Sequence, residues 1–151
     1  MKKLSIVYHS QSKTTAKLAD YVYSGSKKEA DVSVDLILAS DANAETLLSS
    51  DGIIFGTPEN FGYMSGVLKD FFDRTFYQVE DKQLNIPYCI FVSAGNDGQG
   101  AVSSIDRIVK GYPLNKIAEP LIISAKDIEQ ERKRCEDFGH NMAAGLALSI
   151  F

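Results

Sequence analysis

Residues 4–19 read LSIVYHSQSKTTAKLA, and this stretch joins a strand, a polar loop and a helix without a break. Leu4–Tyr8 is short, apolar and rich in β-branched side chains, which predicts a buried strand. From Thr14 to Glu29 the apolar residues recur at the spacing of one helix face, so we expect a helix there. A strand that passes through a hydroxyl-rich loop directly into a helix is the opening unit of an α/β domain.

Four more short apolar runs predict four more strands. They are Val32–Leu38, Gly52–Gly56, Tyr88–Val92 and Pro120–Ser124. The second run alternates polar and apolar residues like an edge strand, whereas the first, third and fourth are nearly unbroken, as in parallel strands covered on both faces. Helical spacing predicts helices over Ser65–Phe76, over Val102–Val109 and from about Asp127 onward, with a shorter one in 43–51.

Strands that alternate with helices imply a parallel sheet with right-handed crossovers. We therefore expect one domain over residues 1–151, a three-layer α/β sandwich around a five-stranded parallel sheet of order 2-1-3-4-5. Ligands of such sheets bind beyond the carboxyl ends of the strands at which the order reverses, here the first and third. The loops that matter are those after Tyr8, after Phe55 and after Val92.

The composition of the chain argues against several classes of function. The chain has 151 residues, 44% of them hydrophobic, and a formal net charge of -4, which argues against general nucleic-acid binding. No segment approaches the roughly 20 apolar residues of a membrane span. The two cysteines show no metal-binding spacing; Cys89 is interpreted as a buried core thiol and Cys135 as a partly buried helix residue. We expect a cytoplasmic protein with no metal site.

The loop after the first strand carries four hydroxyl side chains within six residues. Backbone amides at a helix N-terminus, together with such hydroxyls, form a cradle for a phosphate group. One hydroxyl would be explained as a helix N-cap, but four favour phosphate. The candidate phosphate-binding residues are Ser10, Gln11, Ser12, Lys13, Thr14 and Thr15.

The loops after the third and fourth strands suit a planar ligand. Proline stiffens the first of them, while its glycine allows close backbone approach and its aromatic side chains can cover a ring. The other loop has several glycines, although its Asn-Asp-Gly sequence also makes an ordinary turn. The candidate residues of these loops are Thr57, Pro58, Glu59, Asn60, Phe61 and Gly62, and Ser93, Ala94, Gly95, Asp97 and Gly98.

Two segments resemble known families. Residues 8–19, YHSQSKTTAKLA, resemble the flavodoxin phosphate signature Ser-x-Thr-Gly-x-Thr, with Ser10, Ser12 and Thr15 at its hydroxyl positions and Lys13 in place of its glycine. Residues 52–74, GIIFGTPENFGYMSGVLKDFFDR, closely resemble NADPH-dependent FMN reductases and the tryptophan-repressor-binding type of NAD(P)H:quinone oxidoreductase.

The resemblance implies a flavodoxin-like fold with FMN as cofactor, bound by the residues of the three loops. It implies NAD(P)H-dependent reduction of FMN or quinone-like acceptors, in which the flavin does the chemistry and no side chain acts as a catalyst. A flavodoxin-type electron carrier, served by a redox protein partner, is the alternative, and a domain without its cofactor is a third interpretation. NAD(P)H as the electron donor and a homodimer are left open.

The acidic residues of the ring loops lead to a redox hypothesis. A carboxylate beside a flavin disfavours the negative charge of its reduced form and lowers its reduction potential. Glu59 and Asp97 lie on loops expected at the ring, so exchanging both for amides is expected to raise the potential.

Overall fold

The computed structural model describes all residues from 1 to 151, and its strands form one parallel sheet. The strands are β1 (Lys2–Tyr8), β2 (Val32–Leu38), β3 (Gly52–Pro58), β4 (Pro87–Ala94), β5 (Asn115–Lys116) and β6 (Leu121–Ser124). The sheet runs β2-β1-β3-β4, which confirms the expected order up to its fourth strand. The edge position expected of the second strand is confirmed as well.

The fifth position of the sheet is shared by two short strands. β5 pairs with the start of β4 at Pro87 and Tyr88, and β6 pairs with its end, from Phe91 to Ala94, both in parallel. Pro120, just before β6, has no backbone N–H to donate and interrupts the pairing. The expected order 2-1-3-4-5 is therefore confirmed, with a fifth strand divided into two pieces.

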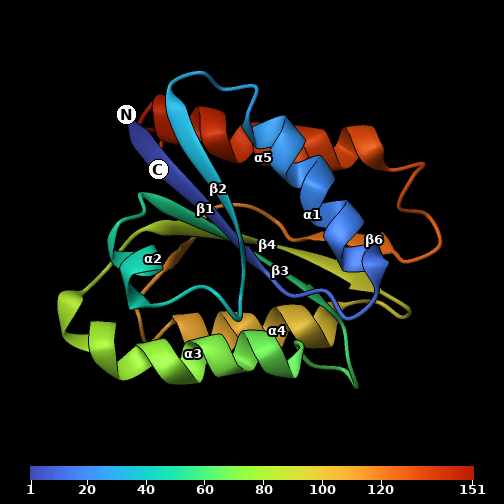
Figure 1. Cartoon of the computed structure of the whole chain (residues 1–151), viewed down its shortest axis with the longest axis horizontal. Coiled ribbons are helices and arrows are strands. Elements are labelled where there is room, and N and C mark those ends of the chain that lie inside the picture. Colours follow the sequence, from blue (N-terminus) through green and yellow to red (C-terminus); the bar gives the residue numbers. More distant parts are fainter.

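Helices cover both faces of this sheet, as Figure 1 shows. The helices are α1 (Lys13–Ser26), α2 (Ala44–Leu48), α3 (Gly66–Val79), a 3-10 turn η1 (Glu80–Lys82), α4 (Gln99–Val109) and α5 (Arg132–Ala147). α1 and α5 lie together on one face, and α3 and α4 lie on the other. The expectation that the last helix begins near Asp127 was wrong by about one turn, because residues 127–131 form a separate turn and α5 begins at Arg132.

Two apolar layers hold the sandwich together. Between the sheet and α3 with α4, Phe55 packs against Phe72 with ring centroids 5.1 Å apart, in a cluster that also contains Phe71 and Tyr112. Between the sheet and α1 with α5, the layer includes Cys89 and Cys135, both fully enclosed. The buried core thiol expected at Cys89 is confirmed, and Cys135, expected to be a partly buried helix residue, lies on α5 but is fully buried. No helix is long and apolar enough to cross a membrane.

Two glycines let α1 and α5 approach very closely. A Cβ on Gly139 would lie 2.0 Å from the carbonyl oxygen of Val22, and one on Gly25 would lie 1.8 Å from that of Glu136. Contacts this short exclude any side chain at either glycine while the helices keep this spacing. The crossing places the N-terminal end of α1 beside β6 and the end of β4 (Figure 1).

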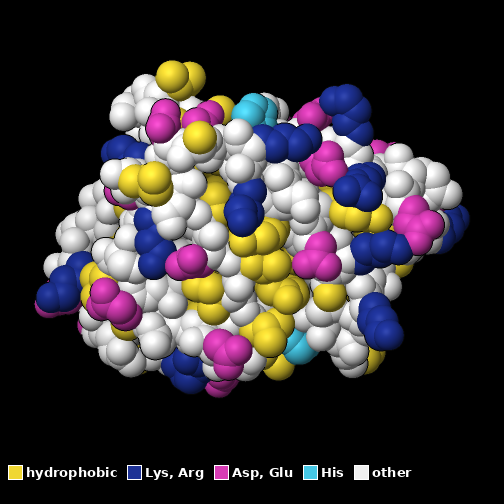
Figure 2. All heavy atoms as spheres, turned by 45° about the horizontal axis from the view of Figure 1, so that its top comes forward, with side chains coloured by type: hydrophobic (Ala, Val, Ile, Leu, Met, Phe, Trp, Pro, Cys, Tyr) yellow, Lys and Arg dark blue, Asp and Glu magenta, His cyan; other side chains and the backbone are white.

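The charged side chains on the face formed by α1 and α5 are of mixed sign. Figure 2 shows Lys and Arg interspersed with Asp and Glu over this view, around a central group of apolar side chains. Several of these charges are paired along α5, such as Arg132 with Glu136 at 2.9 Å and Lys133 with Asp137 at 2.8 Å. This face therefore carries no continuous basic patch.

Candidate functional site

A polar pocket of about 410 Å³ opens at the carboxyl ends of β1, β3 and β4. It lies at the switch point of the sheet, where the strand order reverses. All of its lining residues except Ala125 were predicted from the sequence. They are Gln11, Ser12, Thr14, Thr15, Pro58, Glu59, Asn60, Ser93, Ala94, Gly95 and Ala125.

The first turn of α1 presents free backbone amides to this pocket. Ser12 occupies the N-cap position but its side chain makes no capping bond, so the N–H groups of Lys13, Thr14 and Thr15 have no partner within the helix. The Ser10 hydroxyl accepts a 3.0 Å hydrogen bond from the Ala16 N–H and bonds back to the Ser12 carbonyl oxygen, which holds the loop in shape. The helix dipole adds positive potential at the same point. This arrangement suits a phosphate.

Lys13 has an ordinary backbone in this loop. It is the first residue of α1 and is not among the residues with positive φ. The position at which the flavodoxin signature has glycine therefore needs no left-handed conformation here, and a lysine fits without strain. Its side chain is exposed.

The second loop ends in a tight turn that carries an exposed aromatic ring. Asn60 and Tyr63 exchange two backbone hydrogen bonds of 2.9 and 3.0 Å, and the residues between them, Phe61 and Gly62, have φ of 52° and 69°. Positive φ at both central positions is the pattern of a type I′ turn, in which a phenylalanine is unusual. Phe61 is completely exposed. A strained, exposed aromatic residue at the rim of a pocket suggests a role in binding.

Side chains tie the three loops to one another. The Asn60 amide donates to the Gln11 side-chain oxygen at 3.1 Å, which joins the second loop to the first. The hydroxyls of Thr15 and Ser93 lie 2.6 Å apart and join the first turn of α1 to the end of β4. The pocket walls are thus linked without any ligand.

Glu59 joins the second loop to the third. Its backbone N–H donates to the Ser93 carbonyl oxygen at 3.0 Å. Its carboxylate accepts hydrogen bonds from the backbone N–H groups of Gly98 at 3.3 Å and Gly100 at 3.2 Å. Asp97, by contrast, bonds only locally, accepting from the Gln99 N–H at 3.1 Å.

Several predicted residues lie beside the pocket and do not line it. Thr57 is buried, and its hydroxyl donates to the Pro58 carbonyl oxygen and accepts from the Ser65 N–H at 2.9 Å, so it shapes the loop from behind. The other predicted residues outside the lining are Ser10, Lys13, Phe61, Gly62, Asp97 and Gly98.

Ala125 is the lining residue that sequence reasoning missed. It directly follows β6, and its N–H donates to the Ala94 carbonyl oxygen at 3.0 Å. The signal available was its position after the fifth predicted strand, whose carboxyl end lies at the same edge of the sheet as the others.

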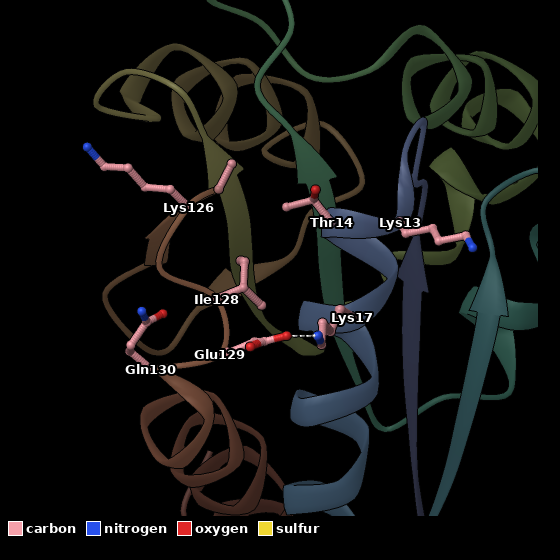
Figure 3. Close-up of a pocket in the computed structure, with 8 residues that line it drawn as sticks. Lys13, Thr14, Lys17, Lys126, Ile128, Glu129 and Gln130 are labelled. Carbon is pink, nitrogen blue, oxygen red and sulfur yellow. Dashed lines mark hydrogen bonds and ion pairs between the residues drawn. The ribbon is translucent and has the colours of Figure 1, made fainter.

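A second groove of about 320 Å³ continues from the pocket, with Thr14 and Ala125 common to both. Figure 3 shows the ion pair between Lys17 of α1 and Glu129 of the β6–α5 connection crossing this groove. The hydrogen bond from Lys17 lowers the pKa of the Glu129 carboxyl. Lys13 and Lys126 also line this groove, and neither forms an ion pair, although the ends of their side chains extend away from the Lys17–Glu129 pair (Figure 3).

Three titratable groups whose pKa is shifted by burial lie outside the pocket lining. Burial raises the pKa of the Cys135 thiol to about 11, with Glu131 acting in the same direction, and burial raises the pKa of the Cys89 thiol further. Burial lowers the pKa of His9, which favours its neutral form at pH 7. None of the three lines the pocket.

Comparisons with known proteins agree with this geometry. Residues 41–112 match the model of the family described as NADPH-dependent FMN reductase. A flavodoxin from Aquifex aeolicus is 26% identical, over 99% of this chain and 90% of the relative. An NAD(P)H dehydrogenase (quinone) from Acidithiobacillus ferrooxidans is 28% identical over 50% of this chain and 48% of its own length, so the likeness spans about half of that protein. Among solved structures, a flavodoxin from the domain Archaea has a TM-score of 0.80 at 20% identity, covering 95% of this chain and 98% of that one.

Proposed function

Since the chain belongs to the flavodoxin-like superfamily and its central segment matches the FMN reductase family, we propose that it is an FMN-binding redox protein. The cofactor would occupy the pocket at the switch point, as part of one binding domain formed by residues 1–151. The observation that carries this proposal is the uncapped N-terminus of α1, whose free amides open into that pocket. The proposed reaction is NAD(P)H-dependent reduction of FMN or of quinone-like acceptors.

The residues of the pocket fit the two ends of FMN. The amides of residues 13–15 and the hydroxyls of Ser12 and Thr14 would hold the phosphate, because they combine hydrogen-bond donors with a positive helix end. Glu59 and Asn60 on one side and Ala94 and Gly95 on the other would flank the ring system. A Cβ on Gly95 would meet no protein atom within 4 Å, so that loop leaves open space for a ligand.

Bound FMN would supply the redox chemistry, accepting electrons from a reduced nicotinamide and passing them to an acceptor. The chain would bind the cofactor, orient its ring and set the charge around it. Phe61 would cover an exposed part of the ring, which would also explain its exposure in a strained turn. No side chain of the pocket is assigned an acid–base role.

An electron carrier of the flavodoxin type is the second candidate. The alignment with the Aquifex aeolicus flavodoxin spans nearly the whole of both chains, which favours it, whereas the family model that matches the central segment favours a reductase. A carrier would take electrons from a redox protein partner and would not react with NAD(P)H directly. We also propose a cytoplasmic location, which is supported by two free thiols and no disulfide.

A flavin titration followed by anaerobic reduction tests these proposals. Apo-protein is titrated with FMN, and binding is followed by the change in the visible flavin spectrum. NADPH or NADH is then added without oxygen. Bleaching of the flavin bands supports the reductase, and bands that persist until a reductase partner is supplied support the carrier. Absence of FMN binding would overturn both proposals.

A further inference from the structure

We propose that Glu59 is a positioning residue that locks the two ring-binding loops together and so orients the flavin ring. This inference rests on the proposed FMN site. In this role Glu59 acts through the protein and not by touching the cofactor, because its carboxylate accepts hydrogen bonds from backbone amides of the opposite loop.

Glu59 caps the N-terminus of α4 from the other loop. The N-cap residue of α4 is Gly98, which has no side chain and stands in a left-handed conformation with φ of 71°. The carboxylate of Glu59 reaches across from the other loop and accepts from Gly98 and Gly100 with one oxygen each. A negative charge at a helix N-terminus is stabilised by the helix dipole, and hydrogen bonds to a charged acceptor are the stronger kind.

A direct backbone contact lies beside this link. A Cβ on Gly100 would come within 2.1 Å of the Gly62 carbonyl oxygen, so the start of α4 packs directly against the turn that carries Phe61. The Glu59 N–H bond to the Ser93 carbonyl oxygen fixes the base of the same loop. The Glu59 carboxylate therefore helps to hold the turn that carries Phe61 against the N-terminus of α4.

Asp97, the other charged residue of these loops, also caps the start of α4 but does not join the two loops. Asp97 is exposed, and its carboxylate bonds only to the N–H of Gln99, two residues along the chain. Loss of the Asp97 charge changes the electrostatics near the ring and leaves the two loops joined. A comparison of variants at Asp97 and Glu59 therefore separates the effect of a lost charge from the effect of a lost link between the loops.

The test compares Glu59→Ala, Glu59→Gln and Asp97→Asn. The Kd for FMN and the visible circular dichroism of the bound flavin are measured for each, since the dichroism reports how rigidly the ring is held. We expect Glu59→Ala to raise the Kd about tenfold and to weaken the dichroism, because a loop that is no longer held loses preorganisation. For Glu59→Gln, the Kd and the dichroism should lie between those of wild type and Glu59→Ala, since a side-chain amide oxygen can replace one of the two acceptor oxygens.

Asp97→Asn is the charge-matched comparison and should change the Kd by less than about threefold while it keeps the shape of the dichroism. Gly100→Ala disturbs the same loops by another means, because its Cβ would force them apart at their contact. It should raise the Kd for FMN and weaken the dichroism as Glu59→Ala does. Agreement between Gly100→Ala and Glu59→Ala would show that the effect comes from separating the loops and not from one particular substitution.

The inference is overturned if wild-type protein binds FMN and Glu59→Ala differs from Asp97→Asn in neither Kd nor dichroism. A wild-type protein that binds no FMN would instead overturn the proposed function. The two failures are therefore distinguished by the wild-type titration alone.

Discussion

The Thr15 hydroxyl of α1 and the Ser93 hydroxyl of β4 lie 2.6 Å apart in a buried position, although the two residues are 78 positions apart in the chain. This pair joins the proposed phosphate loop to the end of a central strand. Each hydroxyl satisfies the other, so the removal of one leaves a buried polar group without its partner.

We expect Thr15→Val and Ser93→Ala each to lower the free energy of unfolding by about 1 to 2 kcal/mol, because each leaves one buried hydroxyl unpaired. The double variant should cost less than the sum of the two, since it removes both partners. Urea unfolding of the apo-proteins measures these values. Strict additivity would show that the pair contributes no coupling.

The phosphate loop contains two serines with different expected roles. The Ser12 hydroxyl contacts only the Thr14 hydroxyl, at 3.3 Å, and lines the pocket, so Ser12→Ala should weaken FMN binding by about tenfold with little effect on stability. The Ser10 hydroxyl caps the Ala16 N–H, so Ser10→Ala should lower the free energy of unfolding by about 1 kcal/mol even without FMN. FMN titrations and urea unfolding of both variants check this difference. Equal effects of the two on both quantities would contradict it.

The fold could be predicted from the sequence because its strands are short apolar runs with clear limits. Val32–Leu38 was expected as a strand and is found with the same bounds. The last helix was placed too early because the Glu131 N–H donates to the Asp127 carbonyl oxygen at 3.2 Å. One helical turn thus precedes α5, and local sequence does not distinguish that turn from the start of the helix.

The site was harder to predict in detail, since side-chain links between distant segments leave no local signal. The loops could be found because the carboxyl ends of parallel strands meet at one edge, but the bonds from Glu59 to Gly98 and Gly100 depend on tertiary structure. Arg74 illustrates the same limit. It belongs to the segment that resembles the FMN reductases, yet it lies away from the pocket and donates to the Ala39 and Ala42 carbonyl oxygens.

The close crossing of α1 and α5 predicts a large effect of one methyl group. Gly139→Ala should lower the free energy of unfolding by about 3 kcal/mol, because its Cβ would overlap the Val22 carbonyl oxygen and push the helices apart. Gly66→Ala is the matched control, because Gly66 begins α3 in open space and alanine is the better helix former. Thermal unfolding of both variants provides the measurement. A Gly139→Ala protein as stable as wild type would show that the helices separate easily.

The two thiols are expected to be unreactive in the folded protein. Arg134 acts to lower the pKa of Cys135, but burial and the charge of Glu131 outweigh it and raise that pKa to about 11. At pH 8 only about one thiol in a thousand is then ionised, and the thiolate is the nucleophile. Burial also raises the pKa of the Cys89 thiol. Alkylation by iodoacetamide at pH 8 should therefore be slow for both residues in native protein and rapid in denaturant. Mass spectrometry of timed samples measures each rate, and rapid labelling of Cys135 in native protein would show that this end of α5 opens readily.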